Sequence, residues 1–329
     1  MPENAGFCWR TRTMDGINFF VLDFHEQSGN SLEAWIAPEF GSNLCRFVVD
    51  GKAVIDFDPE LLLHHDYTGT PILYPTPNRV QNAVFMFRKD SFPQVKRGKQ
   101  VFEHGLVHDE SWEYESPNCE ENAVSFDTRI TFNEESPLFE AFPFHHSLSL
   151  RYSLERDAIV VTYCVDNLGK RELPFGFGLH PYFIKLSGER QTRVVLPASH
   201  VMDANADLIP SGVLHKVDNS IFDLRRPVEI GSLDLDHVFT GIPPGEYASI
   251  EYHENDLCLT LEATPDFSHL VLYSPRGERY FCIENQTCAV NAHNLFAQGF
   301  VKESGLIILP PGEKHMGQVC YRVKKGTLK

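Results

Sequence analysis

Residues 147–154 read Ser-Leu-Ser-Leu-Arg-Tyr-Ser-Leu, and this stretch decides the fold class. Apolar residues occupy every second position, which is the pattern of a β-strand with one buried face. Residues 257–262, Leu-Cys-Leu-Thr-Leu-Glu, show the same alternation. Turn-forming residues stand beside such runs, at Asp50-Gly51 and at residues 254–256. The alternation therefore predicts strands joined by short turns.

Helical patterning is scarce in this chain. Residues 59–65 fit a short helix with proline in its first turn, and residues 291–298 fit another. Strands that recur with almost no helix between them favour an antiparallel sandwich over a β–α–β fold. No linker rich in proline, glycine or serine divides the chain. We therefore expect residues 1–329 to form a single all-β domain, a large antiparallel β-sandwich with few short helices.

The composition is that of an ordinary globular protein, with 42% hydrophobic and 22% charged residues. A net charge of −16 argues against a nucleic-acid partner, because binding phosphates requires a basic surface. No apolar stretch approaches the roughly 20 residues of a membrane span, and the N-terminus lacks the features of a secretory signal. The eight dispersed cysteines fit buried free thiols. We expect a cytoplasmic protein without a membrane partner, either a monomer or a homodimer.

Glu284 is the most informative residue for function. It lies in the apolar, β-prone run 280–287, Tyr-Phe-Cys-Ile-Glu-Asn-Gln-Thr. A bare carboxylate is costly to bury, so this group must be paired, hydrogen-bonded or raised in pKa. Glu284 is therefore either a member of a structural ion pair or a tuned acid or base.

Arg79 and Asp236 are candidate ligand-binding residues. Pro75 and Pro77 favour an extended or turned backbone before Asn78-Arg79. The guanidinium of Arg79 offers several N–H donors in a fixed planar arrangement. A surface ion pair is the alternative interpretation for Arg79. Asp236 precedes an apolar run, where an aspartate more often forms a turn or caps a helix.

The segment 104–113 holds three further candidates. Gly105 permits close approach of the backbone to a ligand beside His104. Trp112 offers a flat apolar face of the kind on which sugars stack. His104 and His108 are four residues apart, which invites a zinc hypothesis, but the segment has neither the metalloprotease pattern nor a helical one.

His180 lies among glycines and aromatic residues and is followed by proline. Such surroundings disfavour the imidazolium form and keep a proton donor or acceptor near neutrality. A core histidine bonded to the backbone is the alternative. We assign the histidines at 64–65 and 145–146 to the surface or to strand ends.

Taken together, these residues resemble the aldose 1-epimerase family, also called galactose mutarotases, from about residue 15 to residue 313. The motifs that carry the resemblance are, in chain order, Asn78-Arg79, His104-Gly105, residues 180–183 (His-Pro-Tyr-Phe), Asp236 before Phe239, and Glu284 within residues 282–287 (Cys-Ile-Glu-Asn-Gln-Thr).

The resemblance implies a galactose mutarotase-like sandwich with an open sugar cleft, and no metal or cofactor. It implies that Glu284 is the general base at the C1 hydroxyl and His180 the general acid at the ring oxygen. His104 would polarise that same oxygen. The expected substrate-binding residues are Arg79, Asn78, Asp236, Trp112 and His108.

Three alternatives stay open. The first is a hexose-6-phosphate mutarotase, disfavoured because His108 stands where several such relatives have arginine, although Arg88, Lys89, Lys96 and Arg97 offer a phosphate patch. The second is a non-catalytic carbohydrate-binding protein on the same fold. The third is a metal-dependent enzyme that uses His104 and His108 with Glu110 or Glu284.

Overall fold

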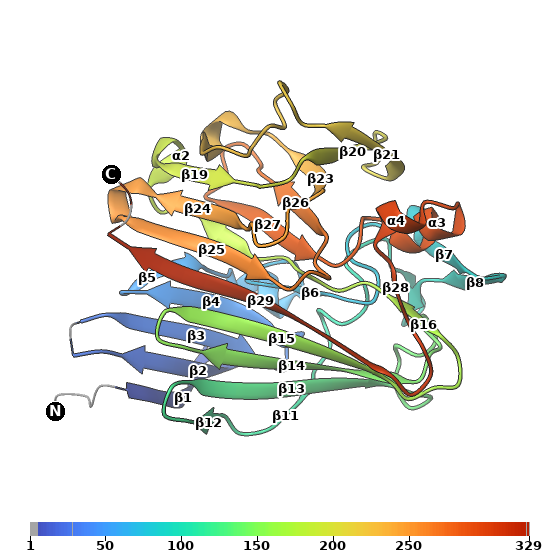
Figure 1. Ribbon diagram of the computed structural model, residues 1–329. Helices are drawn as coiled ribbons and strands as arrows, with labels where there is room; N and C mark the ends of the chain where they lie inside the picture. The colour runs from blue at the N-terminus through green and yellow to red at the C-terminus, as the bar shows by residue number, and fades with distance from the viewer. Residues whose placement is uncertain (1–5, 28, 327, 329) are drawn as a thin grey trace.

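Two large antiparallel sheets pack face to face in the computed structural model, which describes residues 6–27, 29–326 and 328 (Figure 1). Over these residues the larger sheet has 13 strands. Its strands, in spatial order, are β1 (Gly6–Met14), β2 (Ile17–His25), β3 (Ser31–Ala37), β4 (Asn43–Val49), β5 (Lys52–Ile55), β18 (Tyr182–Ile184), β27 (Tyr280–Gln286), β26 (His269–Tyr273), β23 (Asp236–Thr240), β20 (His200–Ala204) and β21 (Pro210–Lys216). In addition, β17 (Gly178–Leu179) pairs with β27, and β6 (Ile72–Leu73) pairs with β17.

The second sheet has ten strands in the described part of the chain. They run in the order β11 (Glu113–Tyr114), β13 (Val124–Phe132), β14 (His146–Leu154), β15 (Ala158–Asn167), β29 (Lys314–Lys325), β25 (Leu257–Ala263), β24 (Ala248–Tyr252), β19 (Thr192–Val195) and β22 (Val228–Glu229), and β12 (Asn118–Cys119) pairs with β13.

Short elements complete the described structure. The small strand pairs are β7 (Val84–Phe87) with β8 (Asp90–Pro93), β9 (Val95–Lys96) with β10 (Lys99–Gln100), and β16 (Leu173–Phe175) with β28 (Ile307–Leu309). The helices are α1 (Pro59–Leu63), α2 (Gly188–Gln191), α3 (Ala292–Ala297) and α4 (Val301–Ser304), with 3-10 turns η1 (Gln81–Ala83), η2 (Ile230–Ser232) and η3 (His253–Asn255).

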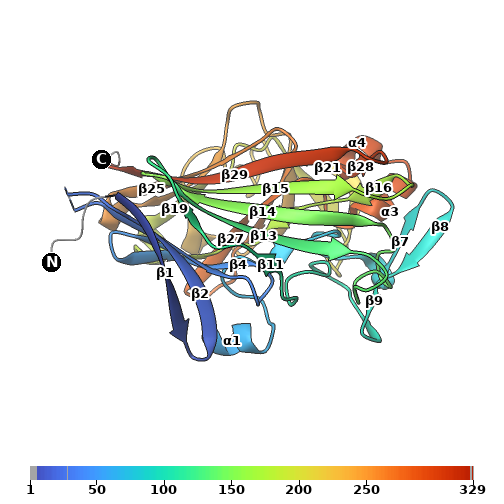
Figure 2. The same ribbon diagram turned by 90° about the horizontal axis from the view of Figure 1, so that it is seen from below.

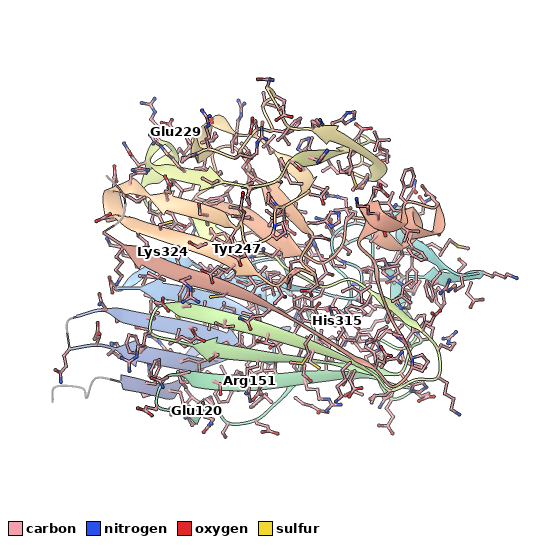
Figure 3. All side chains as sticks on the ribbon, in the orientation of Figure 1. Glu120, Arg151, Glu229, Tyr247, His315 and Lys324 are labelled. Atoms are coloured by element: carbon pink, nitrogen blue, oxygen red, sulfur yellow. The ribbon has the colours of Figure 1, made fainter. Side chains whose placement is uncertain are left out.

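The alternation at 147–154 does form a strand, β14, and that at 257–262 forms most of β25, so both predictions are confirmed. In β14 the leucines and Tyr152 are buried between the sheets. Arg151 points outward, where it forms an ion pair of 2.6 Å with Asp127 of β13 (Figure 3). The sandwich predicted from period two is the observed architecture.

Both predicted helices are also present. Asp58 caps α1, because its side chain accepts hydrogen bonds from the backbone N–H groups of Glu60 and Leu61. The helix predicted at 291–298 is α3, which begins after Asn291 in the left-handed conformation. Both helices end within a few residues of the predicted bounds.

The main core lies between the sheets, but the larger sheet is also covered in part on its outer face. Near one end an apolar cluster around Phe19 and Trp35 packs against Leu62 of α1, and Figure 2 shows α1 beside the lower ends of β1 and β2. Near the other end Val238 and Val271 pack with α3. The polar residues described below lie on the outer face between these two clusters.

Among the described residues, no helix combines the length and the apolar character that crossing a membrane requires. None of the eight cysteines, all of which lie in the described part of the chain, forms a disulfide. Cys45, Cys282, Cys288 and Cys320 are buried, as expected. That expectation is wrong for Cys8 and Cys119, which are exposed.

Several imidazoles are deeply buried, and His146 is the clearest case. It begins β14, as a strand-end assignment predicts, but its ring stacks on Phe132 inside the core. Its Nδ1–H donates a bond of 2.6 Å to the carbonyl of Phe144, and its Nε2 has no partner among the described residues. Burial lowers the pKa of His146 to about 3, because the imidazolium would lose its hydration.

Replacing His146 with glutamine should therefore reduce the sensitivity of the fold to acid. The unfolded state takes up a proton on this ring near pH 6.5 and the folded state only near pH 3, so stability falls as the pH drops through this window. The loss of unfolding free energy between pH 7 and pH 4.5 should be smaller in His146→Gln by about 2–3 kcal/mol. Urea unfolding at the two pH values measures it, and an unchanged pH dependence would contradict the assignment.

Candidate active site

Strand β27 places Glu284 on the outer face of the larger sheet. Along this strand Phe281 and Ile283 point into the main core, so Cys282, Glu284 and Gln286 point to the opposite face. The Glu284 side chain is only 1% exposed. The Nε2 of Gln286 donates a hydrogen bond of 2.8 Å to Glu284 Oε2, which fixes the orientation of the carboxyl group.

The register of the neighbouring strands brings His180 to Glu284. Gly178 of β17 pairs with Gln286, and Tyr182 of β18 pairs with Cys282. Because both intervals are four residues long, His180 lies opposite Glu284 and faces the same side. The His180 Nε2 is 3.3 Å from Glu284 Oε1, and both side chains are buried.

Burial moves the pKa values of this pair in opposite directions. Loss of hydration raises the pKa of Glu284 well above its usual value; Gln286 and Arg79 partly oppose the rise, while Asp236 adds to it. Burial lowers the pKa of His180 to about 4. Burial therefore favours the uncharged forms of the pair, a carboxylic acid beside a neutral imidazole.

His104 stands beside His180, with 5.0 Å between the ring centroids and the rings nearly perpendicular. Its backbone has a positive φ of 61°, an uncommon conformation for a residue other than glycine. Burial, with the charges of His180, His108 and Arg79, lowers the pKa of His104 well below its usual value. Its Nδ1 is buried and has no partner within the described structure.

Gly105 was expected to allow a ligand close to the backbone, but here it allows the backbone of Tyr74 to come close. A Cβ at this position would lie 2.2 Å from the carbonyl oxygen of Tyr74. The close approach is thus to the chain's own backbone and not to a ligand, which corrects the prediction. Tyr74 and Gly105 form a β-bridge, as do Arg79 and Glu103, so these bridges hold the loop of His104 against the loop of Arg79.

Arg79 and Asp236 form an ion pair in which NH2 and Oδ2 are 3.3 Å apart, and both side chains are about one quarter exposed. Asn78 orients the arginine, because its Oδ1 accepts bonds from the Arg79 backbone N–H and from NH1. Asp236 pairs with Tyr273, which pairs with Cys282 of β27, so it faces the same side as Glu284. Because Arg79 contacts Asp236, both groups lie on the face of the sheet that carries Glu284.

The prediction for Trp112 is wrong. Its ring is buried in the main core, and its indole N–H donates to the carbonyl of Val107 at 3.2 Å, so no face is available to a sugar. His108 is half-buried, and the ring of Tyr67 contacts both histidines, with its centroid 4.9 Å from that of His108 and 4.4 Å from that of His104. His104, and not His108, is the histidine whose ring contacts His180.

Four residues that border the site were not among the predicted site residues, although two of them lie in the quoted motifs: Gln286, Tyr67, Tyr182 and Tyr273. Gln286 and Tyr182 stand two residues after Glu284 and His180, respectively. In a strand this spacing places side chains on the same face, so the two-residue period could have predicted that Gln286 and Tyr182 lie near the site. Tyr67 and Tyr273 come from other segments, and nothing in their own surroundings in the sequence indicates the site.

A metal site receives no support from the side chains. In the described part of the chain, no group of three or more histidine, cysteine, aspartate or glutamate side chains is arranged to hold a metal ion. Glu110, one of the proposed ligands, is instead bound by Lys96 at 3.0 Å and by Arg97 at 2.8 Å.

Comparison with known proteins agrees with the geometry. A family model described as aldose 1-epimerase matches residues 27–322, so this chain belongs to the aldose 1-epimerase family. A galactose mutarotase-like protein from Clostridium acetobutylicum has the same fold, with a TM-score of 0.85 and 20% identity over 98% of this chain and all of that one.

Among curated sequences, the uncharacterized protein YihR of Escherichia coli is 24% identical over 242 residues, covering 71% of this chain and 74% of that protein. The galactose mutarotase of Sus scrofa is 25% identical over 177 residues, covering 52% of this chain and 49% of that protein. The family and the fold are thereby established.

Replacing Trp112 with alanine should destabilise the protein, because it opens a cavity in the main core. We expect the unfolding free energy to fall by about 3–5 kcal/mol. Trp9→Ala is the control, since Trp9 is 38% exposed on the edge strand β1, and we expect it to cost less than about 1 kcal/mol. Urea unfolding measures both. A Trp112→Ala protein of normal stability that binds sugar more weakly would restore the stacking hypothesis.

Proposed function

We propose that this protein is an aldose 1-epimerase that interconverts the α and β anomers of an uncharged aldose by opening and reclosing its ring. The observation that carries the proposal is the buried contact of 3.3 Å between the Glu284 carboxyl group and the His180 imidazole. A pure binding protein has no need to bury two groups that exchange a proton so readily. The partly exposed Arg79–Asp236 pair beside them supplies the polar groups that sugar hydroxyls require.

The proposed reaction needs one proton removed and one delivered. Glu284 takes the proton of the C1 hydroxyl, and the C1–O5 bond breaks as C1–O1 becomes a carbonyl. The electron pair of the broken bond goes to O5, which takes a proton from His180. After rotation about C1–C2, O5 attacks the other face of C1, His180 recovers its proton and Glu284 returns one to O1. No electrons are gained or lost, so we propose that the enzyme works without a cofactor.

The uncharged and the charged forms of the Glu284–His180 pair hold the same number of protons. The reactive form, carboxylate with imidazolium, differs from the uncharged form only by a proton shift over the short distance between the two groups. Ring opening converts the charged form into the uncharged one, which burial favours. The same burial disfavours the charged form before the step, so starting from the uncharged form it gives no net gain; the expected contribution is that of positioned proton transfer, typically on the order of 10²–10⁴ in rate for each transfer.

The remaining residues hold the substrate in this proposal. His104, kept neutral by burial, donates an N–H to the ring oxygen or to a neighbouring hydroxyl. Arg79 donates to sugar oxygens and Asp236 accepts from hydroxyls, while Asn78 keeps the guanidinium in place. His108 contacts the ring of Tyr67, which in turn contacts His104.

A phosphorylated substrate is disfavoured by the ion pairs of the surrounding cations. Lys96 contacts both Asp109 and Glu110, and Arg97 contacts the same two carboxylates. The guanidinium of Arg88 binds Glu172 at 2.7 Å. These cations are largely neutralised by their partners. Three of the four residues predicted to form a phosphate patch, Arg88, Lys96 and Arg97, are therefore occupied by carboxylates.

Replacing Glu284 with glutamine should abolish anomer exchange and leave the fold intact. The amide keeps the shape of the acid but cannot take a proton, so we expect the rate to fall by about 10²–10⁴. The change in optical rotation, or in the anomeric NMR signals, of freshly dissolved α-D-glucose or α-D-galactose measures it.

Glu229→Gln is the matched control for this substitution. Glu229 lies on strand β22 of the second sheet (Figure 3), where it is about half exposed and 3.7 Å from Arg193, so its replacement should not change the rate. Full activity of Glu284→Gln would remove Glu284 from its role. Saturable sugar binding by the wild-type protein, with no acceleration of anomer exchange for any aldose, would favour a binding protein instead.

A further inference from the structure

A hollow of about 290 Å³ adjoins the catalytic pair and takes no part in the reaction proposed above. This volume is at the lower end of the range of ligand pockets, roughly 300 Å³. Three aromatic side chains, Tyr67, Tyr182 and Tyr280, form much of its wall, and Leu61 and Ile184 add aliphatic surface. The combination of flat rings and small apolar side chains is one on which sugar rings pack.

Two of these tyrosines touch the catalytic imidazoles directly. The ring of Tyr182 stacks on His180 with 5.0 Å between centroids and an angle of 12° between the planes. Tyr67 meets His104 edge to face at 4.4 Å. The third, Tyr280, packs against Tyr182 at 4.9 Å. The hollow therefore begins at the rings that contact the two histidines.

The proposed reaction defines which part of a sugar would reach the hollow. C1 must lie at Glu284 and the ring oxygen at His180, while Arg79 and Asp236 are on the β23 side of Glu284. The hollow is on the opposite side, where β18 and its neighbours lie. In an aldopyranose, C5 and its substituent C6 follow the ring oxygen, so a group attached at C6 points toward the three tyrosines.

The charged groups of the hollow favour a neutral substituent. Asp56 is paired with Arg46 at 2.7 Å, Asp58 caps α1, and Glu278 and Arg279 stand at the exposed rim. Three carboxylates thus face one arginine among the lining residues. Such a surface accepts hydrogen bonds from hydroxyls and repels a phosphate group.

We propose that this hollow is a subsite for a second sugar ring and that the enzyme prefers a reducing disaccharide linked through C6 to the free hexose. This inference rests on the proposed function and adds to it the size and charge of the substrate. Tyr67, Tyr182 and Tyr280 provide the surface on which the second ring packs.

Anomer exchange of isomaltose, glucose and glucose 6-phosphate by the wild-type protein tests the subsite. Isomaltose and glucose 6-phosphate carry their substituents at the same carbon, one neutral and one anionic. We expect kcat/KM to be about two- to tenfold higher for isomaltose than for glucose, mainly through KM, and lower for glucose 6-phosphate than for glucose.

Tyr280→Ala removes part of the wall and should lower the ratio of the isomaltose to the glucose kcat/KM toward one. This ratio does not depend on the fraction of protein that is folded. Tyr247→Ala is the matched control, since Tyr247 is 39% exposed in the loop between β23 and β24 and does not line the hollow; it should leave the ratio unchanged.

Three results would overturn the subsite: an isomaltose kcat/KM no higher than that of glucose, a wild-type ratio retained in Tyr280→Ala, or a preference for glucose 6-phosphate. Each of these still shows anomer exchange with glucose. Failure of the proposed function would instead appear as no acceleration with any of the three sugars.

Discussion

The burial of one carboxyl group, that of Glu284, constrains the rest of the site. A charge in this position would lose its hydration, so the group must share its proton or receive hydrogen bonds. Gln286 supplies a hydrogen bond from the same strand, and His180 supplies a proton acceptor from the neighbouring one. His180 is placed by strand register, so its contact with Glu284, which we propose to be catalytic, depends on the pairing of β27 with β17 and β18.

The fold encloses this contact, since both side chains are buried, and the partly exposed Arg79–Asp236 pair lies beside it. The apolar clusters beneath α1 and α3 cover the outer face of the larger sheet on either side of the site. Between them, the loops of Arg79 and His104 are bound to each other by backbone bridges and lie over the strands. In the proposed mechanism, two of the substrate-binding groups, Arg79 and Asn78, are thus carried on a loop, whereas the proposed base Glu284 lies within the central strand β27.

Much of this arrangement could be predicted from the sequence. The alternation of apolar and polar residues at 147–154 indicates a strand with one buried face, and repeated strands of this kind indicate a sandwich. Glu284 stands out because a carboxylate in an apolar strand has few acceptable environments. The position of Trp112 could not be predicted, since tryptophan occurs both in cores and in binding clefts. Its neighbours in the sequence do not distinguish these two environments.

Residues brought in by long-range packing were the hardest to predict. Gly105 was assigned to a ligand because a glycine beside a histidine does not reveal which backbone approaches it, and here it is that of Tyr74. Tyr67 reaches His104 from a separate loop, and Tyr273 reaches the site from β26. Only the three-dimensional register shows that such residues share one face.

The pH dependence of kcat/KM for anomer exchange, measured at constant ionic strength, tests the central claim most directly. If the Glu284–His180 pair works with one shared proton, a second proton removes the base and loss of the last proton removes the acid. The rate should therefore show a plateau around neutral pH and fall on both the acidic and the alkaline side. A rate that keeps rising with pH, with no alkaline limb, would contradict the account.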